Sequence, residues 1–160
     1  MCYFQETKTE MLSFVRTDAS HPDFQLLVSQ LDAYLAVQDG EDHDFYHQYN
    51  HIHDIKYAIV AFLDGKAIGC GAIKNFSPQQ MEVKRMYVSP DVRGQGIASQ
   101  LLSQLEGWAK ELGCQSCVLE TGKRQPEAIA LYQKNGYARI PNYGQYVEME
   151  KSVCFEKKIG

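Results

Sequence analysis

The most constraining feature of this sequence is a glycine-rich turn between an expected strand and an expected helix. The strand covers residues 81–88, Pro90 ends it, and the turn that follows reads Arg93-Gly94-Gln95-Gly96. From Gly96 to residue 112, apolar residues recur at helical spacing, which predicts an amphipathic helix. The first turn of such a helix leaves backbone N–H groups unpaired, and glycines let a ligand approach the backbone closely. The segment therefore predicts a binding site for an anion such as a pyrophosphate, with Arg93 adding a positive charge.

Two familiar phosphate-binding motifs do not explain this turn. No Gly-Lys-Ser/Thr sequence ends it, so it is not a P-loop, and the third glycine and distant acid of a dinucleotide fingerprint are missing. Taken alone, two glycines ahead of a helix fit a tight helix entry equally well. The whole string from residue 88 to residue 98 is more particular.

The remaining pattern predicts a mixed sheet with helices on its faces. Asp64-Gly65 is a tight-turn dipeptide between two strand patterns, Ser20 and Pro22 suit a helix start, and Gly113 and Gly136 suit helix ends. The expected strands are residues 11–16, 57–63, 66–74, 81–88, 116–120, 137–140 and 146–155. A first helix is expected to begin near residue 22, and three further helices are expected at residues 41–49, 96–112 and 126–135. We find no linker or repeat and expect one domain, residues 1–160.

A second motif lies in the last expected helix and reads Ala128-Ile-Ala-Leu131-Tyr132-Gln-Lys-Asn135-Gly136-Tyr137. Together with Arg93, Gly96 and Ala98 of the turn, it resembles the two signature motifs of the GNAT superfamily of acyl-CoA-dependent N-acyltransferases. The order of expected elements resembles that fold from residue 11 to the end. The resemblance implies an α/β (α+β) fold, with a largely antiparallel mixed sheet of about seven strands flanked by about four helices.

The resemblance also implies acetyl-CoA as co-substrate and a place for it. The backbone of residues 94–99 would hold the pyrophosphate, and the strand end at residues 86–88 would bind the pantetheine arm like an added strand. Gln125 stands where the family often has an asparagine that contacts CoA. The expected cofactor-binding residues are Met86, Tyr87, Val88, Arg93, Gly94, Gln95, Gly96, Ile97, Ala98, Ser99, Gln125 and Tyr132.

For catalysis, the resemblance implies Tyr132 as the general acid toward the CoA sulfur and Glu82 as the base. Tyr132 also fits a packed core tyrosine, and Glu82 also fits a salt-bridge partner of Lys84 or Arg85. Glu120, or water, is the rival base. Strand alternation places Glu82, Lys84, Met86 and Val88 on one face. No Ser/His/Asp or Cys/His arrangement is evident, so direct transfer in a ternary complex is expected instead of an acyl-enzyme.

The acceptor side is less defined. In relatives the region between the first two helices shapes the acceptor pocket, so the expected contacts there are Tyr46, His47, Tyr49 and Asn50. Glu120, as the rival base, and Tyr143, which fits core packing equally well, are added to them. His43, His47 and His51 align at helical spacing, which fits an exposed polar face or pocket lining better than a metal site. We therefore expect no metal. The segment from Ile140 to Tyr146 resembles a recurrent ending of bacterial GNAT proteins.

Bulk properties narrow the function further. A net charge of −4 argues against nucleic-acid binding, no stretch approaches the roughly 18 apolar residues of a membrane span, and the N-terminus resembles no targeting signal. Five scattered cysteines are expected to be reduced thiols of a cytoplasmic protein. We therefore expect an acetyltransferase acting on a primary amine of a small molecule or amino acid. The alternatives are a non-catalytic acyl-CoA sensor and a protein amino-group acetyltransferase, and the resemblance allows a homodimer.

Overall fold

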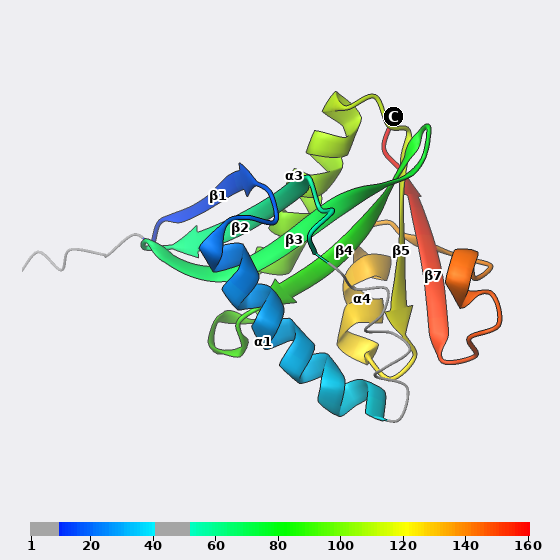
Figure 1. The fold of residues 1–160 in the computed structure, drawn as a ribbon, viewed down its shortest axis with the longest axis horizontal. Coiled ribbons are helices and arrows are strands. Elements are labelled where there is room, and N and C mark those ends of the chain that lie inside the picture. The colour runs from blue at the N-terminus through cyan, green and yellow to red at the C-terminus, as the bar shows by residue number, and fades with distance from the viewer. Residues whose placement is uncertain (1–9, 41–51) are drawn as a thin grey trace, which may run out of the picture.

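A computed structural model describes residues 10–40 and 52–160. Within these residues the chain forms one seven-stranded sheet, in the order β1-β2-β3-β4-β5-β7-β6, with three α-helices packed on it (Figure 1). The strands are β1 (Leu12–Thr17), β2 (Tyr57–Leu63), β3 (Lys66–Ser77), β4 (Gln80–Val88), β5 (Ser116–Gly122), β6 (Ala138–Ile140) and β7 (Ser152–Lys158). The helices are α1 (Pro22–Asp39), α3 (Ile97–Glu111) and α4 (Pro126–Lys134). The expected mixed, largely antiparallel sheet is confirmed, and the helix expected at residues 41–49 lies outside the described residues.

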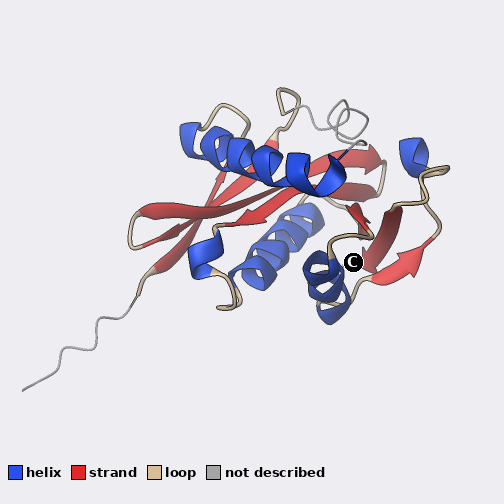
Figure 2. Cartoon of the chain, turned by 90° about the horizontal axis from the view of Figure 1, so that it is seen from below, coloured by secondary structure: helices blue, strands red, loops and turns tan. Residues whose placement is uncertain are grey.

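The helices divide between the two faces of the sheet (Figure 2). On one face, Phe24 and Leu27 of α1 pack with Val60 of β2 in a buried cluster. On the other face, Leu101 of α3 packs with Ile59 of β2 in a second cluster that also takes in side chains of α4. Because neighbouring residues of β2 enter opposite clusters, this strand is buried on both sides, which explains its continuous apolar sequence.

The turns and helix ends largely follow the sequence signals. Asp64 and Gly65 have φ angles of 51° and 82°, the pattern of a type I′ hairpin turn, and they join Leu63 to Lys66 in register. Gly113 and Gly136, with φ of 88° and 91°, follow the C-terminal caps of α3 and α4.

The start of α1 corrects one prediction. Ser20 does not cap the helix, because its hydroxyl donates to Asp18 at 2.6 Å. The cap is His21, whose Nδ1 accepts a hydrogen bond from the backbone N–H of Asp23 at 3.1 Å. Pro22 occupies the first helical turn as expected.

Strands β4 and β5 are the only parallel neighbours in the described sheet, and they separate soon after they meet. Only three residue pairs join them, and the last is Glu82 opposite Val118. Beyond this pair, the side of β4 that faces β5 has no strand partner. This opening between the two strands positions the candidate site described below.

A β-bulge at Arg85 overturns the expected alternation along β4. Arg85 has φ of 59°, and the register with β3 shifts between Cys70 and Ala72, so that β4 carries one extra residue there. Val83 and Met86 consequently pack toward the same cluster, on the α3 face, although three positions separate them. Glu82 and Lys84 therefore lie on the opposite face from Met86 and Val88, and these four residues do not share a face as predicted.

The end of the chain also differs from the prediction. The last strand begins at Ser152 and not at Tyr146, because residues 141–151 form a loop that contains a short 3-10 turn, η3 (Gly144–Tyr146). The side chain of Asn142 donates to three carbonyls of this region, those of Tyr146, Met149 and Ser152. These contacts stabilise the loop where the sequence pattern indicated a strand.

Candidate active site

The glycine-rich turn forms an open cradle at the N-terminus of α3. Gly94 and Gly96 have φ of 79° and 78°, in the left-handed region that favours glycine, and Gly96 is the N-cap of the helix. A Cβ added at either glycine would meet no atom within 4 Å. The backbone is therefore open to a ligand at the end of the helix where N–H groups and partial positive charge are presented.

A groove of about 560 Å³ runs past this cradle. Its described walls come from α1, the end of β4, the glycine turn, the start of α3, and α4. The expected cofactor-binding residues that line it are Met86, Tyr87, Val88, Arg93, Gly94, Gly96, Ile97, Ala98, Ser99, Gln125 and Tyr132. Gln95, the remaining member of that expected set, is exposed in the turn and does not line the groove.

Arg93 is held against the end of β4. Its Nε donates to the carbonyl of Val88 at 2.9 Å, and its guanidinium lies 5.7 Å from the ring centre of Tyr34 and 5.8 Å from that of Tyr87. These contacts fix a permanent positive charge in the wall of the groove.

Tyr132 lies where the groove meets a second pocket, and it lines both. Its side chain comes from α4, is 7% exposed, and packs edge-on against Tyr137 with ring centres 5.8 Å apart. Burial raises the pKa of the Tyr132 phenol, and the negative charge of Glu120 raises it further. The phenol therefore keeps its proton at neutral pH and is available as a hydrogen-bond or proton donor.

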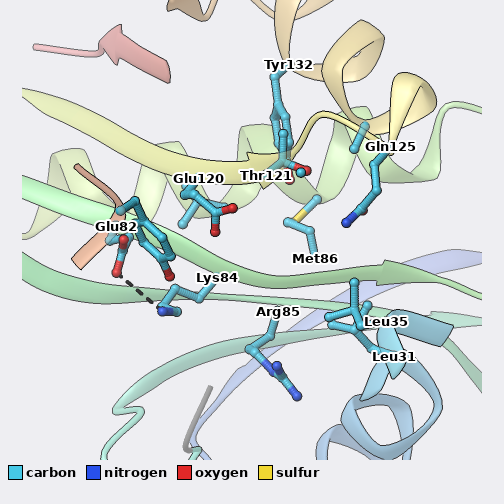
Figure 3. Close-up of a pocket in the computed structure, with 14 residues that line it drawn as sticks. Leu31, Leu35, Glu82, Lys84, Arg85, Met86, Glu120, Thr121, Gln125 and Tyr132 are labelled. Atoms are coloured by element: carbon cyan, nitrogen blue, oxygen red, sulfur yellow. Dashed lines mark ion pairs between the residues drawn. The ribbon is translucent and has the colours of Figure 1, made fainter. Parts of the chain in front are cut away.

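The second pocket, of about 130 Å³, lies in the opening between β4 and β5 (Figure 3). Glu82 and Lys84 stand on its β4 side, and Glu120 stands on its β5 side together with Tyr132 of α4. Two carboxylates thus face one small space next to a neutral phenol. This arrangement suits an amine, which binds as a cation and reacts after losing a proton.

Glu82 is buried and makes contacts with two other side chains. The hydroxyl of Tyr143 donates to its Oε2 at 2.5 Å, and Nζ of Lys84 lies 3.6 Å from its Oε1. Burial, and then Glu82 itself, raise the pKa of Tyr143 above its ordinary value. The Glu82 carboxylate is therefore held in place by a protonated phenol and a nearby ammonium group.

The expected acceptor contacts fall into two groups. Glu120 lines the second pocket and Tyr143 contacts Glu82, whereas Tyr46, His47, Tyr49 and Asn50 lie outside the described residues. Several pocket residues were not predicted as site residues: Leu31, Leu35, Lys84, Arg85 and Thr121. The apolar spacing of α1 indicated only core packing for its two leucines, and no local signal placed Arg85 at a bulge.

Arg85 belongs to the pocket wall and also connects it to α1. Its side chain is buried, and its Nη2 lies 2.5 Å from Oδ1 of Asp32 on α1. Its Nε has no hydrogen-bond partner among the described residues. Figure 3 shows this guanidinium turned away from Glu120 and Tyr132. Arg85 thus anchors the bulge of β4 to the helix that covers it.

Metal and membrane features are absent from the described part of the chain. No group of three or more His, Cys, Asp or Glu side chains there forms a candidate metal site, and no described helix is long and apolar enough to cross a membrane. The four described cysteines are free and buried, and burial raises the pKa of Cys117 to about 12. The expected histidine alignment at residues 43–51 lies outside the described residues.

Comparison with known proteins identifies the family. The model of the acetyltransferase (GNAT) family matches residues 24–137. An IAA acetyltransferase of Azospirillum brasilense is 35% identical over 142 residues, which are 83% of this chain and 88% of that protein. The crystal structure of a putative acyl-CoA N-acyltransferase from Klebsiella pneumoniae is 31% identical and superposes with a TM-score of 0.79 over 94% of this chain and 99% of the other.

A more distant structure shares the fold. A GNAT acetyltransferase of Elizabethkingia anophelis with acetyl-CoA bound is 18% identical and has a TM-score of 0.65, covering 92% of this chain and 97% of that one. The family match covers most of the chain, and the glycine cradle and the Tyr132 helix both lie within it. This chain belongs to the GNAT family of acetyltransferases and is an acyltransferase.

Proposed function

We propose that this enzyme transfers an acetyl group from acetyl-CoA to the primary amine of a small molecule, by direct attack within a ternary complex. The observation that carries the proposal is the meeting of two cavities at Tyr132. One is the long groove that begins at the glycine cradle of α3, and the other is the small pocket with the carboxylates of Glu82 and Glu120. A thioester that follows the groove would reach the pocket at this phenol.

The groove fits acetyl-CoA in two respects. The open backbone at Gly94 and Gly96, ahead of a long helix, suits a pyrophosphate, and Arg93 adds charge nearby. The edge of β4 beyond Glu82, which has no partner strand, suits the amides of a pantetheine arm. The acetyl-CoA complex of the Elizabethkingia relative, which shares the fold, supports the same co-substrate. Gln125 lies at the junction of both cavities and is proposed to contact CoA.

The proposed chemistry divides among the residues of the pocket. Glu82, directly or through water, takes a proton from the acceptor ammonium, and the freed nitrogen attacks the thioester carbonyl carbon. A new C–N bond forms, and a backbone N–H at the end of β4 near Val88 stabilises the oxyanion. The C–S bond then breaks, Tyr132 donates its proton to the leaving sulfur, and the second proton lost by the nitrogen restores the phenol. The products are the N-acetyl amine and CoA.

The size of the pocket favours a small acceptor. Its volume of about 130 Å³, as bounded by the described residues, is well below the roughly 300–1,000 Å³ of typical ligand pockets. A protein amino group is the second acceptor class that the same chemistry serves. We place the reaction in the cytoplasm, since the free cysteines suit a reducing compartment.

The test measures acetyl-CoA binding by calorimetry and thiol release with an amine panel of ethanolamine, spermidine, free amino acids and a lysine peptide. We expect binding, and turnover with at least one small amine. Tyr132→Phe should lower kcat by about 100-fold, the lower end of general acid–base effects, and leave the Kd for acetyl-CoA within about twofold.

Tyr137→Phe is the matched control, because it makes the same change on the neighbouring ring. The Tyr137 hydroxyl donates to Glu106 and does not line either cavity, so kcat should persist. Binding of acetyl-CoA without thiol release for any amine would favour the sensor function instead. Full turnover in Tyr132→Phe would remove Tyr132 as the acid.

A further inference from the structure

The loop between β6 and β7, residues 141–151, reaches the acceptor pocket in two ways: Tyr146 lines the pocket, and Tyr143 contacts Glu82. From this loop the hydroxyl of Tyr143 donates to Oε2 of Glu82 at 2.5 Å, although 61 positions separate the two residues. Glu82 is 8% exposed, so the bond is shielded from water. Because the hydroxyl is already engaged, Tyr143 acts on Glu82 more directly than on a bound acceptor.

The ring of Tyr143 is braced on two sides. Phe76, at the end of β3, meets it edge-on with ring centres 4.7 Å apart, and Tyr146 of the same loop meets it at 6.0 Å. Edge-to-face contacts at these distances are favourable, and each restricts the rotation of the ring. The hydroxyl of Tyr143 is therefore directed at one place, the Glu82 carboxylate.

The backbone that carries Tyr143 is fixed by its neighbour in sequence. Nδ2 of Asn142 donates to the carbonyls of Tyr146 at 3.1 Å, Met149 at 3.0 Å and Ser152 at 3.0 Å. One amide thus closes the loop onto the start of β7. Asn142 is the covalent neighbour of Tyr143, whose hydroxyl donates to Glu82, so the contacts run from the start of β7 through the loop to the carboxylate.

We propose that Tyr143 and Asn142 are positioning residues for the catalytic base: Tyr143 orients the Glu82 carboxylate, and Asn142 holds the loop that presents Tyr143. The inference rests on the proposed function, in which Glu82 is the base. It gives the loop at residues 141–151 a defined task in acetyl transfer and assigns a role to Asn142.

The electrostatic part of the argument has a definite sign. A hydrogen bond donated to a carboxylate favours its charged form, so removing the donor makes the carboxylate take up a proton at higher pH. Tyr143 stays protonated as a donor because burial and Glu82 raise its pKa. Two lysines are near Glu82: Lys84 on the same strand, and Lys74, which lies opposite Glu82 on β3 and pairs with Asp54. The other titratable groups around it are Glu120 on β5, Tyr146 of the loop and Cys154 on β7. Tyr143→Phe leaves all of these in place.

The test follows the Glu82 carboxyl directly by NMR, in protein labelled with ¹³C at glutamate side chains. The Glu82→Gln variant identifies the resonance, because that signal disappears. In Tyr143→Phe we expect the chemical shift of this resonance to change, because the carboxylate loses the hydrogen bond that Tyr143 donates. The low-pH limb of kcat/KM, measured with the best amine of the panel, should move to higher pH, with lower kcat and unchanged Kd for acetyl-CoA.

Asn142→Ala tests the second part of the chain of contacts. It should reproduce the Tyr143→Phe phenotype, and the double variant should be no worse than the more severe single variant, because both changes remove the same interaction. Tyr137→Phe is the control in every measurement and should leave the resonance and the limb unmoved. If Asn142→Ala does not fold, Tyr143→Phe alone decides, because it keeps the ring and its packing.

The outcomes separate the inference from the proposed function. If Glu82→Gln keeps full turnover, the assignment of the base is wrong, whatever Tyr143 does. If Glu82→Gln loses turnover but Tyr143→Phe leaves the resonance, the pH limb and kcat unchanged, the base stands and the positioning role is overturned. The NMR measurement requires no acceptor, so it reports on the contact even if no amine in the panel is a substrate.

Discussion

Glu82 and Glu120 face the same pocket but have different neighbours, and these neighbours assign them different tasks. Glu82 accepts a hydrogen bond from Tyr143 and lies near Lys84, so its carboxylate is fixed and electrostatically supported. Burial, and to a smaller extent the charge of Glu120, raise the pKa of Tyr132, which keeps the proton on the phenol that we propose as the acid. On this basis we propose that Glu82 serves the amine and that Glu120 serves the acid.

This division predicts different pH profiles for two matched variants. A base works only when ionised, so kcat/KM falls as the pH drops through its titration, and this low-pH limb should disappear in Glu82→Gln together with a loss of about 100-fold or more. Glu120→Gln should keep the limb, since it leaves the proposed base, Glu82, unchanged. The measurement is kcat/KM against pH for both variants. A lost limb in Glu120→Gln alone would transfer the role of the base to Glu120.

At this scale the sequence predicts residues that belong to a motif and misses those defined by distant contacts. Tyr132 could be found because the residues around it form a recognisable string, and Glu82 because of its place on the fourth strand. Lys84 and Arg85 were considered only as salt-bridge partners of Glu82. The contact of Tyr143 with Glu82 joins residues 61 positions apart, and no local pattern encodes it.

Among the elements, α3 bears most directly on the co-substrate. Its first turn presents unpaired N–H groups and partial positive charge to the groove, so a negative charge placed there should compete with a pyrophosphate. Gly96→Glu adds that charge, and it also places a side chain on a backbone with φ of 78°. We expect at least a tenfold weaker Kd for acetyl-CoA by calorimetry, and a small loss of stability from the strained backbone.

Gly107→Glu is the control for this prediction. It makes the same substitution on the same helix, at an exposed position where a Cβ meets no atom within 4 Å and where helical backbone suits any residue. It should stabilise the helix slightly and leave the Kd unchanged. Equal affinities for the two variants would contradict the location of the phosphate site at the start of α3.

The element boundaries show which signals are local. The turn at Asp64 and Gly65 was predicted because the dipeptide itself favours the backbone angles of the turn. The bulge at Arg85 and the late start of β7 were not predicted, since the bulge depends on register with β3 and the loop depends on three hydrogen bonds from Asn142. Both features shape the acceptor pocket. The geometry of the acceptor pocket therefore depends more on tertiary contacts than the geometry of the glycine cradle does.

At the scale of the whole described structure, the sheet has two parts that are joined by a short parallel pairing. Strands β1 to β4 and strands β5 to β7 meet through only three residue pairs between β4 and β5, and both cavities lie along that opening. The groove takes walls from α1 and β4 on one side and from α4 on the other. A ligand that fills it contacts both parts and stabilises the arrangement in which they face each other.

This geometry predicts a large thermal stabilisation by acetyl-CoA. A ligand that binds only the folded state, present at 100 times its Kd, adds about 2.7 kcal/mol to the free energy of unfolding. For a chain of this size, that corresponds to an increase in Tm of about 5–10 °C, which differential scanning calorimetry resolves. Gly96→Glu, with a Kd at least tenfold weaker, should show at most about half of this increase at the same acetyl-CoA concentration, whereas Gly107→Glu should show all of it. Because the cradle lies on one part of the sheet and Tyr132 on the other, Tyr132→Phe should retain most of the increase. A full increase in Gly96→Glu would mean that the co-substrate binds elsewhere.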